Sequence, residues 1–102
     1  MSGDTVPGAA AELTRHDAVL RALWRVQDPE LGMSIVKLGL IYDIVIEETD
    51  VVVSMTLTTR GCPLAEPLTE AVRRVVSELP WVTSVVVRLV WEPAWTPERI
   101  LQ

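Results

Sequence analysis

Residues 51–79, VVVSMTLTTRGCPLAEPLTEAVRRVVSEL, decide the fold because they change from the periodicity of a β-strand to that of an α-helix. In the first part, apolar residues alternate with mostly polar ones, as in a half-buried strand. In the second part, an apolar stripe recurs at helical spacing, which predicts a helix over about residues 64–78. The stripe consists of Leu64, Leu68, Val72, Val75, Val76 and Leu79. The stretch therefore predicts a strand, a loop and an amphipathic helix, in that order.

The single cysteine of the chain, Cys62, falls in this loop between Gly61 and Pro63. Near the N-terminus of a helix, backbone N–H groups lack intrahelical partners and the helix dipole favours an anion. A thiol at this position has a reason to ionise more readily than a free cysteine. Free cysteine is also among the most buried residue types, so a small thiol that fills space at the junction is an equal alternative.

Two β-type runs, LIYDIVIEE (40–48) and VVVSMTLTT (51–59), are separated by Thr49 and Asp50, which predicts a tight hairpin at these two residues. A third run, VTSVVVRLVW (82–91), predicts another strand after the helix. If the second and third strands are parallel, the helix between them makes a right-handed crossover.

An earlier helix is predicted over about residues 15–26, because Val19, Ala22, Leu23 and Val26 share one helical face. Thr14 and Asp17 resemble a capping box at its start. Residues 1–12 are expected to form a flexible N-terminal tail.

These elements predict a single small α+β domain over residues 13–102, in the order α-β-β-α-β. We expect a three-stranded mixed sheet with both helices on its apolar face. The residues expected to supply most of the core are Tyr42, Ile44, Ile46, Val53, Met55, Leu57, Leu68, Val72, Val75, Val85, Val87 and Leu89.

The second face of the sheet also carries apolar residues. Val86 and Val90 of the third strand are expected near Ile41, Val45 and Val52, with nothing predicted to cover them. An uncovered apolar surface is a candidate self-association patch, so we expect a homodimer as one form of the protein.

Composition excludes several classes of function. One cysteine and one histidine, His16, cannot build a closed structural zinc site. Fourteen acidic and nine basic residues give a formal net charge of −5, and the arginines are scattered, which is unlike a nucleic-acid-binding surface. No apolar run approaches the roughly 20 residues that span a bilayer, and the segment MSGDTVPGAA does not resemble a signal peptide. We expect a cytoplasmic protein that binds neither nucleic acid nor membranes.

Three stretches carry a family resemblance: DPELGMSIVKLGLIYDI (28–44), MTLTTRGCPL (55–64) and VWEPAWTPERI (90–100). Together they resemble the small iron–sulfur cluster assembly domain family that includes the PaaD-like and SufT-like proteins. The hallmarks of that family are an Asp-Pro-Glu loop leading to Leu-Gly-Leu, a Thr-x-x-x-Cys-Pro loop and a Trp-x-Pro-x-Trp tail. The resemblance runs from about residue 15 to residue 101.

The resemblance implies an accessory role in the assembly or delivery of iron–sulfur clusters, with Cys62 as a transient ligand of iron or of a cluster. It implies that the partners are iron–sulfur assembly proteins or client apoproteins. The site residues that it implies beside Cys62 are Asp28, Glu30, Leu31, Thr58 and Thr59. Carboxylates can complete an iron shell and threonine hydroxyls can donate hydrogen bonds to a thiolate, but Asp28 is also a common turn former and Glu30 can simply be solvated.

Two further functions stay open at this point. The PaaD-like branch of the family implies an adaptor or maturation subunit for a multicomponent, phenylacetyl-CoA-type oxygenase. A thiol enzyme is the less favoured alternative, because the sequence shows no reliable Cys/His pair and no second cysteine for a resolving disulfide. Trp95 is expected either to fold over the cysteine loop or to anchor a partner.

Overall fold

The computed structural model describes residues 7–58, 63 and 65–101, with side chains from Thr14 onward. Its elements are α1 (Pro7–Trp24), β1 (Gln27–Asp28), β2 (Met33–Ser34), β3 (Ile41–Glu47), β4 (Asp50–Met55), α2 (Ala65–Ser77), β5 (Ser84–Leu89) and the 3-10 helix η2 (Pro97–Arg99). The predicted order α-β-β-α-β is confirmed for the main elements. The short strands β1 and β2 form an additional antiparallel pair that the sequence did not reveal.

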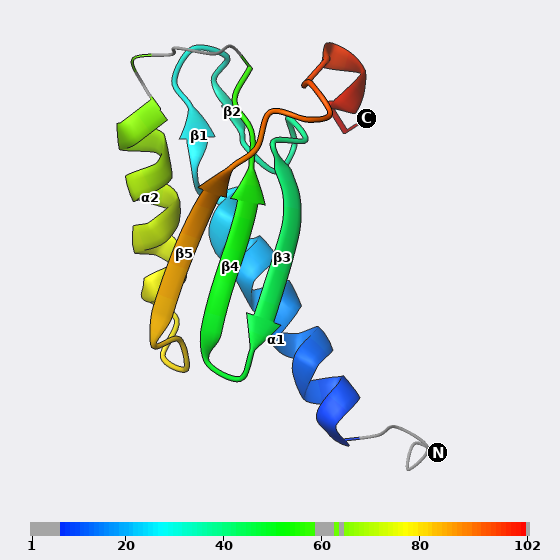
Figure 1. Cartoon of the computed structure of the whole chain (residues 1–102), viewed down its shortest axis with the longest axis vertical. Coiled ribbons are helices and arrows are strands. Elements are labelled where there is room, and N and C mark those ends of the chain that lie inside the picture. Colours follow the sequence, from blue (N-terminus) through cyan, green and yellow to red (C-terminus); the bar gives the residue numbers. More distant parts are fainter. Residues whose placement is uncertain (1–6, 59–62, 64, 102) are drawn as a thin grey trace.

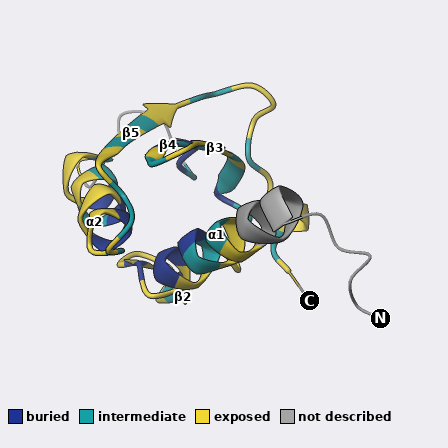
Figure 2. Cartoon of the chain, turned by 90° about the horizontal axis from the view of Figure 1, so that it is seen from below, coloured by how far each residue is buried: buried dark blue, intermediate teal, exposed yellow. Residues whose placement is uncertain are grey.

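The three longer strands form one mixed sheet in the order β3-β4-β5. β3 and β4 pair antiparallel, and β4 and β5 pair parallel after the crossover through α2. Both helices lie on the same side of this sheet, as Figures 1 and 2 show. α1 contacts α2 and β3, and α2 contacts β5. The predicted fold class is confirmed.

The core lies between the sheet and the helices. Its buried apolar residues are Val19, Ala22, Leu23, Val26, Ile35, Leu38, Leu40, Val51, Val53, Met55, Leu57, Leu68, Val72, Val75 and Val76. Ile44, Ile46, Val85 and Val87 pack against this core while partly exposed. The segment before β3 adds Ile35, Leu38 and Leu40, which were missing from the predicted core.

Two residues of the predicted core do not belong to it. The register between β3 and β4 shifts between Ile41 and Asp43, so Ile41 packs against the core instead of Tyr42. The Tyr42 hydroxyl donates a hydrogen bond to the backbone oxygen of Pro93 at 2.8 Å. Leu89 ends the edge strand β5 and is 38% exposed. An irregularity in the ladder and a strand end therefore account for both errors.

The first helix begins earlier than predicted. α1 starts at Pro7, so residues 7–12 belong to the helix rather than to a tail, and Thr14 lies inside the helix instead of capping it. Proline suits the first turn of a helix, and the run of three alanines and a glutamate that follows has high helix propensity. Residues 1–6 lie outside the described part of the chain. No helix within that described part is long and apolar enough to cross a membrane.

The hairpin turn lies one residue before its predicted place. Glu47 pairs with Asp50, so the two turn residues are Glu48 and Thr49. Glu48 adopts a φ of 57°, in the left-handed region that tight hairpins use. A glutamate gives no sequence signal for that conformation, which explains the error.

The segment after β5 crosses back to the start of β3, as Figure 1 shows. The backbone N–H of Leu101 donates to the Lys37 oxygen at 2.7 Å. The Arg99 guanidinium lies over the Tyr42 ring, with 4.7 Å between the Cζ atom and the ring centroid. This C-terminal segment therefore covers one end of the sheet.

Candidate functional site

The loop between β1 and β2 is built around Asp28. This side chain is only 5% exposed, and its Oδ1 atom accepts hydrogen bonds from the backbone N–H groups of Glu30 at 2.8 Å and Leu31 at 3.2 Å. The backbone N–H of Gly32 donates to the Asp28 carbonyl at 2.7 Å. Asp28 therefore shapes the loop, which is the turn-forming role considered from the sequence.

The same loop presents two of the predicted site residues to solvent. Glu30 is exposed, and Leu31 is 44% exposed although it is a large apolar residue. Because Asp28 holds the backbone at both positions, their side chains project from a fixed turn rather than from a free loop. An exposed acid beside an exposed leucine is suited to contact with another molecule.

The end of β4 provides the second part of the site. The backbone N–H of Thr56 donates to the Leu40 oxygen at 2.9 Å, and Leu57 is 4% exposed. Thr58, a predicted site residue, is half-buried at the point where the described strand segment ends. The other two predicted residues of this loop, Thr59 and Cys62, lie outside the described residues.

The first turn of α2 lies next to the β1–β2 loop. A groove of about 170 Å³ between them is lined by Gln27, Pro29, Pro67, Leu68 and Ala71. The loop residue Pro29 and the helix residue Pro67 thus share one small depression. In Figure 1 the β1–β2 loop and the start of α2 lie at the same end of the molecule. The fold therefore brings together Asp28, its loop and the helix start that follows Cys62 in the chain.

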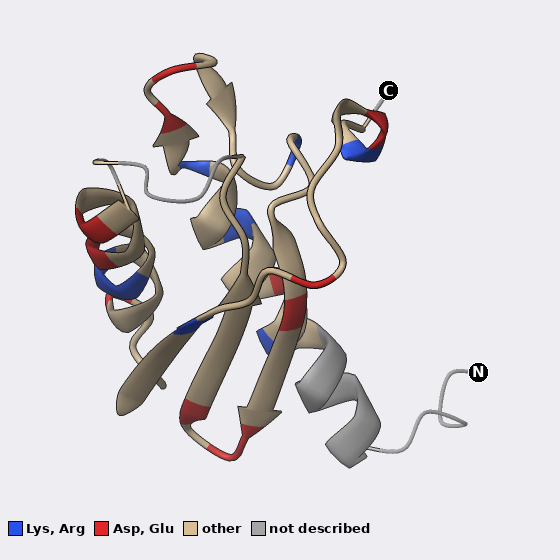
Figure 3. Cartoon of the chain, turned by 45° about the horizontal axis from the view of Figure 1, so that its top comes forward, with Lys and Arg blue, Asp and Glu red and all other residues tan. Residues whose placement is uncertain are grey.

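Three acidic residues of the described chain lie at this end of the molecule. Asp28 and Glu30 lie in the loop, and Glu66 lies in the first turn of α2 (Figure 3). Among residues 7–58, 63 and 65–101, no group of three or more His, Cys, Asp and Glu side chains could hold a metal ion. Asp28 and Glu30 therefore do not build a metal centre with other described residues, and one oxygen of Asp28 is already engaged by backbone donors.

Thr56 is a residue of this region that the sequence did not single out. Its side chain is 1% exposed, and its hydroxyl has no hydrogen-bond partner among the described residues. The alternation of apolar and polar residues predicts that Thr56 faces away from the core, whereas the structure buries it. Thr56 is the first of three threonines in the run MTLTT, and a threonine there does not by itself reveal burial.

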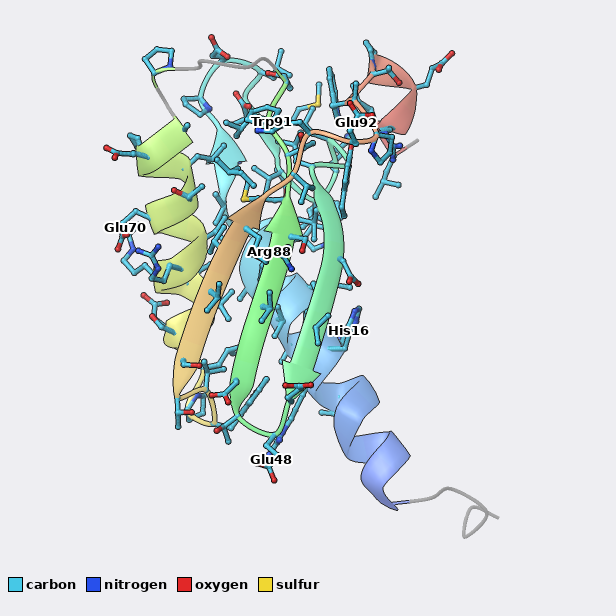
Figure 4. All side chains as sticks on the ribbon, in the orientation of Figure 1. His16, Glu48, Glu70, Arg88, Trp91 and Glu92 are labelled. Carbon is cyan, nitrogen blue, oxygen red and sulfur yellow. The ribbon has the colours of Figure 1, made fainter. Side chains whose placement is uncertain are left out.

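Two other residues considered from the sequence lie elsewhere. Trp95 is half-buried, and its Nε1–H donates to the Leu38 carbonyl at 2.7 Å, which gives it a role within the chain. Its partner-binding role stays a prediction. His16 is exposed on α1, away from the β1–β2 loop (Figure 4).

Comparison with known proteins gives a consistent result. The family described as iron–sulfur cluster assembly protein matches residues 16–87. The Fe-S protein maturation auxiliary factor YitW of Bacillus subtilis is 42% identical over 83 residues, which cover 80% of this chain and 81% of the relative. The corresponding factor SufT of Staphylococcus aureus is 42% identical over 76 residues, covering 74% and 86%. A domain of unknown function DUF59 from Bacillus anthracis has a TM-score of 0.83 at 37% identity, covering 90% of this chain and 89% of that one.

Proposed function

This chain belongs to the iron–sulfur cluster assembly protein family, and we propose that it is an accessory factor that assists the assembly or delivery of clusters to client proteins. The observation that carries the proposal is the 42% identity to two maturation auxiliary factors over most of both chains. The proposed partners are then cluster assembly proteins or client apoproteins, and we propose that the protein acts in the cytoplasm.

We propose Cys62 as the residue that contacts the cargo. Thiolate is the soft ligand that iron–sulfur clusters prefer, and Cys62 is the only cysteine of the chain. α2 begins at Ala65, close after Cys62 in the sequence, and a helix start favours the thiolate over the thiol. Clusters are ordinarily held by four cysteines, so one thiol leaves most positions for ligands from a donor or client. Transient binding during transfer follows from this shortage.

The β1–β2 loop is assigned a supporting role in the same proposal. Asp28 fixes the backbone, while Glu30 and Leu31 are exposed beside the start of α2. We assign contact with the donor or client to Glu30 and Leu31, and loop shape to Asp28. Thr58 and Thr59 are assigned hydrogen bonds to the thiolate or to a cluster sulfide.

A deletion strain tests the proposed function. The activity of several cluster-dependent enzymes is measured per unit of enzyme protein, with and without a plasmid that carries this chain. We expect the activities to fall in the deletion strain while the enzyme amounts stay similar, and the plasmid to restore them. If all cluster enzymes keep full activity, the proposal is wrong. If only a multicomponent oxygenase loses activity, the chain is an adaptor for that oxygenase instead.

A further inference from the structure

The face of the sheet turned away from the helices carries a row of valines that neither helix covers. Val45 pairs with Val52, and Val52 pairs with Val86, so these three valines lie side by side across β3, β4 and β5. Val45 is 43% and Val86 is 51% exposed. In Figures 1 and 2 both helices lie on the opposite side of the sheet. We refer to Val45, Val52 and Val86 as the valine row.

The neighbouring row carries opposite charges at its two ends. Asp43 pairs with Ser54, and Ser54 pairs with Arg88, which Figure 4 shows on β5. Two strand spacings separate Asp43 from Arg88, roughly 10 Å, with the small Ser54 between them. Neither side chain forms an ion pair with another described residue, although Arg88 and Asp43 are both exposed. An acid therefore lies at one edge of the face and a base at the other, and the Asp43 carboxylate accepts a hydrogen bond only from the neighbouring backbone N–H of Ile44 among the described contacts.

We propose that this face binds a second copy of the same chain, through a twofold axis that runs parallel to β4 between the two sheets. Such an axis places β3 of each copy over β5 of the other and keeps each residue row at its own level. The valine rows then face each other, with Val45 of one copy opposite Val86 of the second copy. Packed sheets lie about 10 Å apart, a distance that interdigitating side chains fill.

The charges select this axis. With the axis parallel to β4, Asp43 of each copy faces Arg88 of the second copy, so two attractive pairs form in the row beside the valines. A twofold axis in the same plane but perpendicular to the strands would place β3 over β3 and β5 over β5. Asp43 of one copy would then lie along the same edge as Asp43 of the second copy, and Arg88 along the same edge as Arg88 of the second copy. The Ser54 side chain at the centre is small enough for either arrangement, so the charges rather than the packing decide.

A third row opposes association in a predictable way. Glu47 pairs with Asp50, and Asp50 pairs with Ser84. Because Asp50 begins the central strand, the proposed axis places it opposite Asp50 of the second copy. The Ser84 hydroxyl donates a hydrogen bond to the Asp50 carboxylate at 2.8 Å, but a neutral hydroxyl does not offset the negative charge of Asp50. The dimer is therefore expected to be weakened by this one contact, and Asp50→Asn should tighten it.

Sedimentation velocity over a range of concentrations tests the inference on the full chain. We expect wild-type protein to show a monomer–dimer equilibrium and Val86→Lys to sediment as a monomer. Leu101→Lys is the matched control, because Leu101 is also 51% exposed but lies outside the sheet. A wild-type protein that stays monomeric at its highest soluble concentration overturns the proposal. So does a Val86→Lys variant, folded by circular dichroism, that still dimerises.

A charge-swap experiment tests the axis itself, at low salt where screening is weak. Asp43→Arg and Arg88→Asp are each expected to raise the dimer dissociation constant at least about tenfold, or about 1.4 kcal/mol, because each faces a like charge. Mixed in equal amounts, the two variants should form a heterodimer, because both facing pairs become attractive again. The double variant should also dimerise with itself. Single variants that dimerise like wild type, or a mixture that stays monomeric, overturn the proposed arrangement.

Discussion

The Asp28 carboxylate accepts a hydrogen bond from the backbone N–H of Glu30 at 2.8 Å, and through this contact a buried acid holds the shape of an exposed loop. A buried carboxylate is costly unless it is hydrogen-bonded, and here the donors come from the loop itself. The loop in turn lies against the first turn of α2, across the groove that Pro29 and Pro67 line. The position of Glu30 and Leu31 beside the site thus depends on one side chain that faces inward.

Replacing Asp28 should separate loop shape from charge. We expect Asp28→Ala to lower the free energy of unfolding by about 2 kcal/mol, because two backbone donors lose a charged acceptor. Asp28→Asn keeps an acceptor oxygen and should cost less than about 1 kcal/mol. Urea denaturation measures both. Equal stability of the alanine variant and wild type would show that these hydrogen bonds do not hold the loop.

The contact between Gly39 and the C-terminal segment predicts a strong effect of a single methyl group. Gly39 has a φ of +77°, and a Cβ atom there would lie 2.5 Å from the Arg99 carbonyl oxygen. We expect Gly39→Ala to cost about 3 kcal/mol, from backbone strain and the clash together. The matched control is Gly32→Ala, where φ is +67° but nothing lies within 4 Å of the added atom, and about 1 kcal/mol is expected. Thermal unfolding of the two variants compares them, and equal losses would contradict the close approach.

Trp95 offers a test of its role within the chain. Trp95→Phe keeps a ring for packing but removes the Nε1–H donor to Leu38, so we expect a loss of about 1 kcal/mol. Trp24→Phe is the control, because Trp24 is 44% exposed and should change stability by less than about 0.5 kcal/mol. Chemical denaturation measures the difference. Unchanged stability of Trp95→Phe together with lower client activity would favour the partner-anchor role instead.

Much of this fold could be predicted because its main elements are periodic. The alternation in β4 and the apolar stripe of α2 correctly indicated which residues face the core. The strands β1 and β2 have two residues each, too few to show a period. The placement of Tyr42 failed because a register shift moves side chains to the other face without a mark in the sequence.

The site was predictable to a smaller extent. Asp28 was named from the family motif, and its turn-forming role follows from its position before a proline. Its burial depends on the packing of the loop against the rest of the domain, which local sequence does not encode. The exposure of Glu30 and Leu31 likewise follows from the hydrogen bonds of Asp28. The placement of Thr59 and Cys62 stays a prediction, since both lie outside the described residues.

The most direct test of the proposed function is the activity of a cluster-dependent enzyme in cells whose only copy of this chain carries Cys62→Ser. Serine keeps the size and a hydrogen-bonding group but removes the soft sulfur ligand. We expect the variant protein to unfold within about 1 kcal/mol of wild type, because the change is nearly isosteric. Asp28→Asn should lower the client activity less than Cys62→Ser does. The prediction is that Cys62→Ser restores little client activity at wild-type protein levels, whereas full restoration would contradict a thiol-centred mechanism.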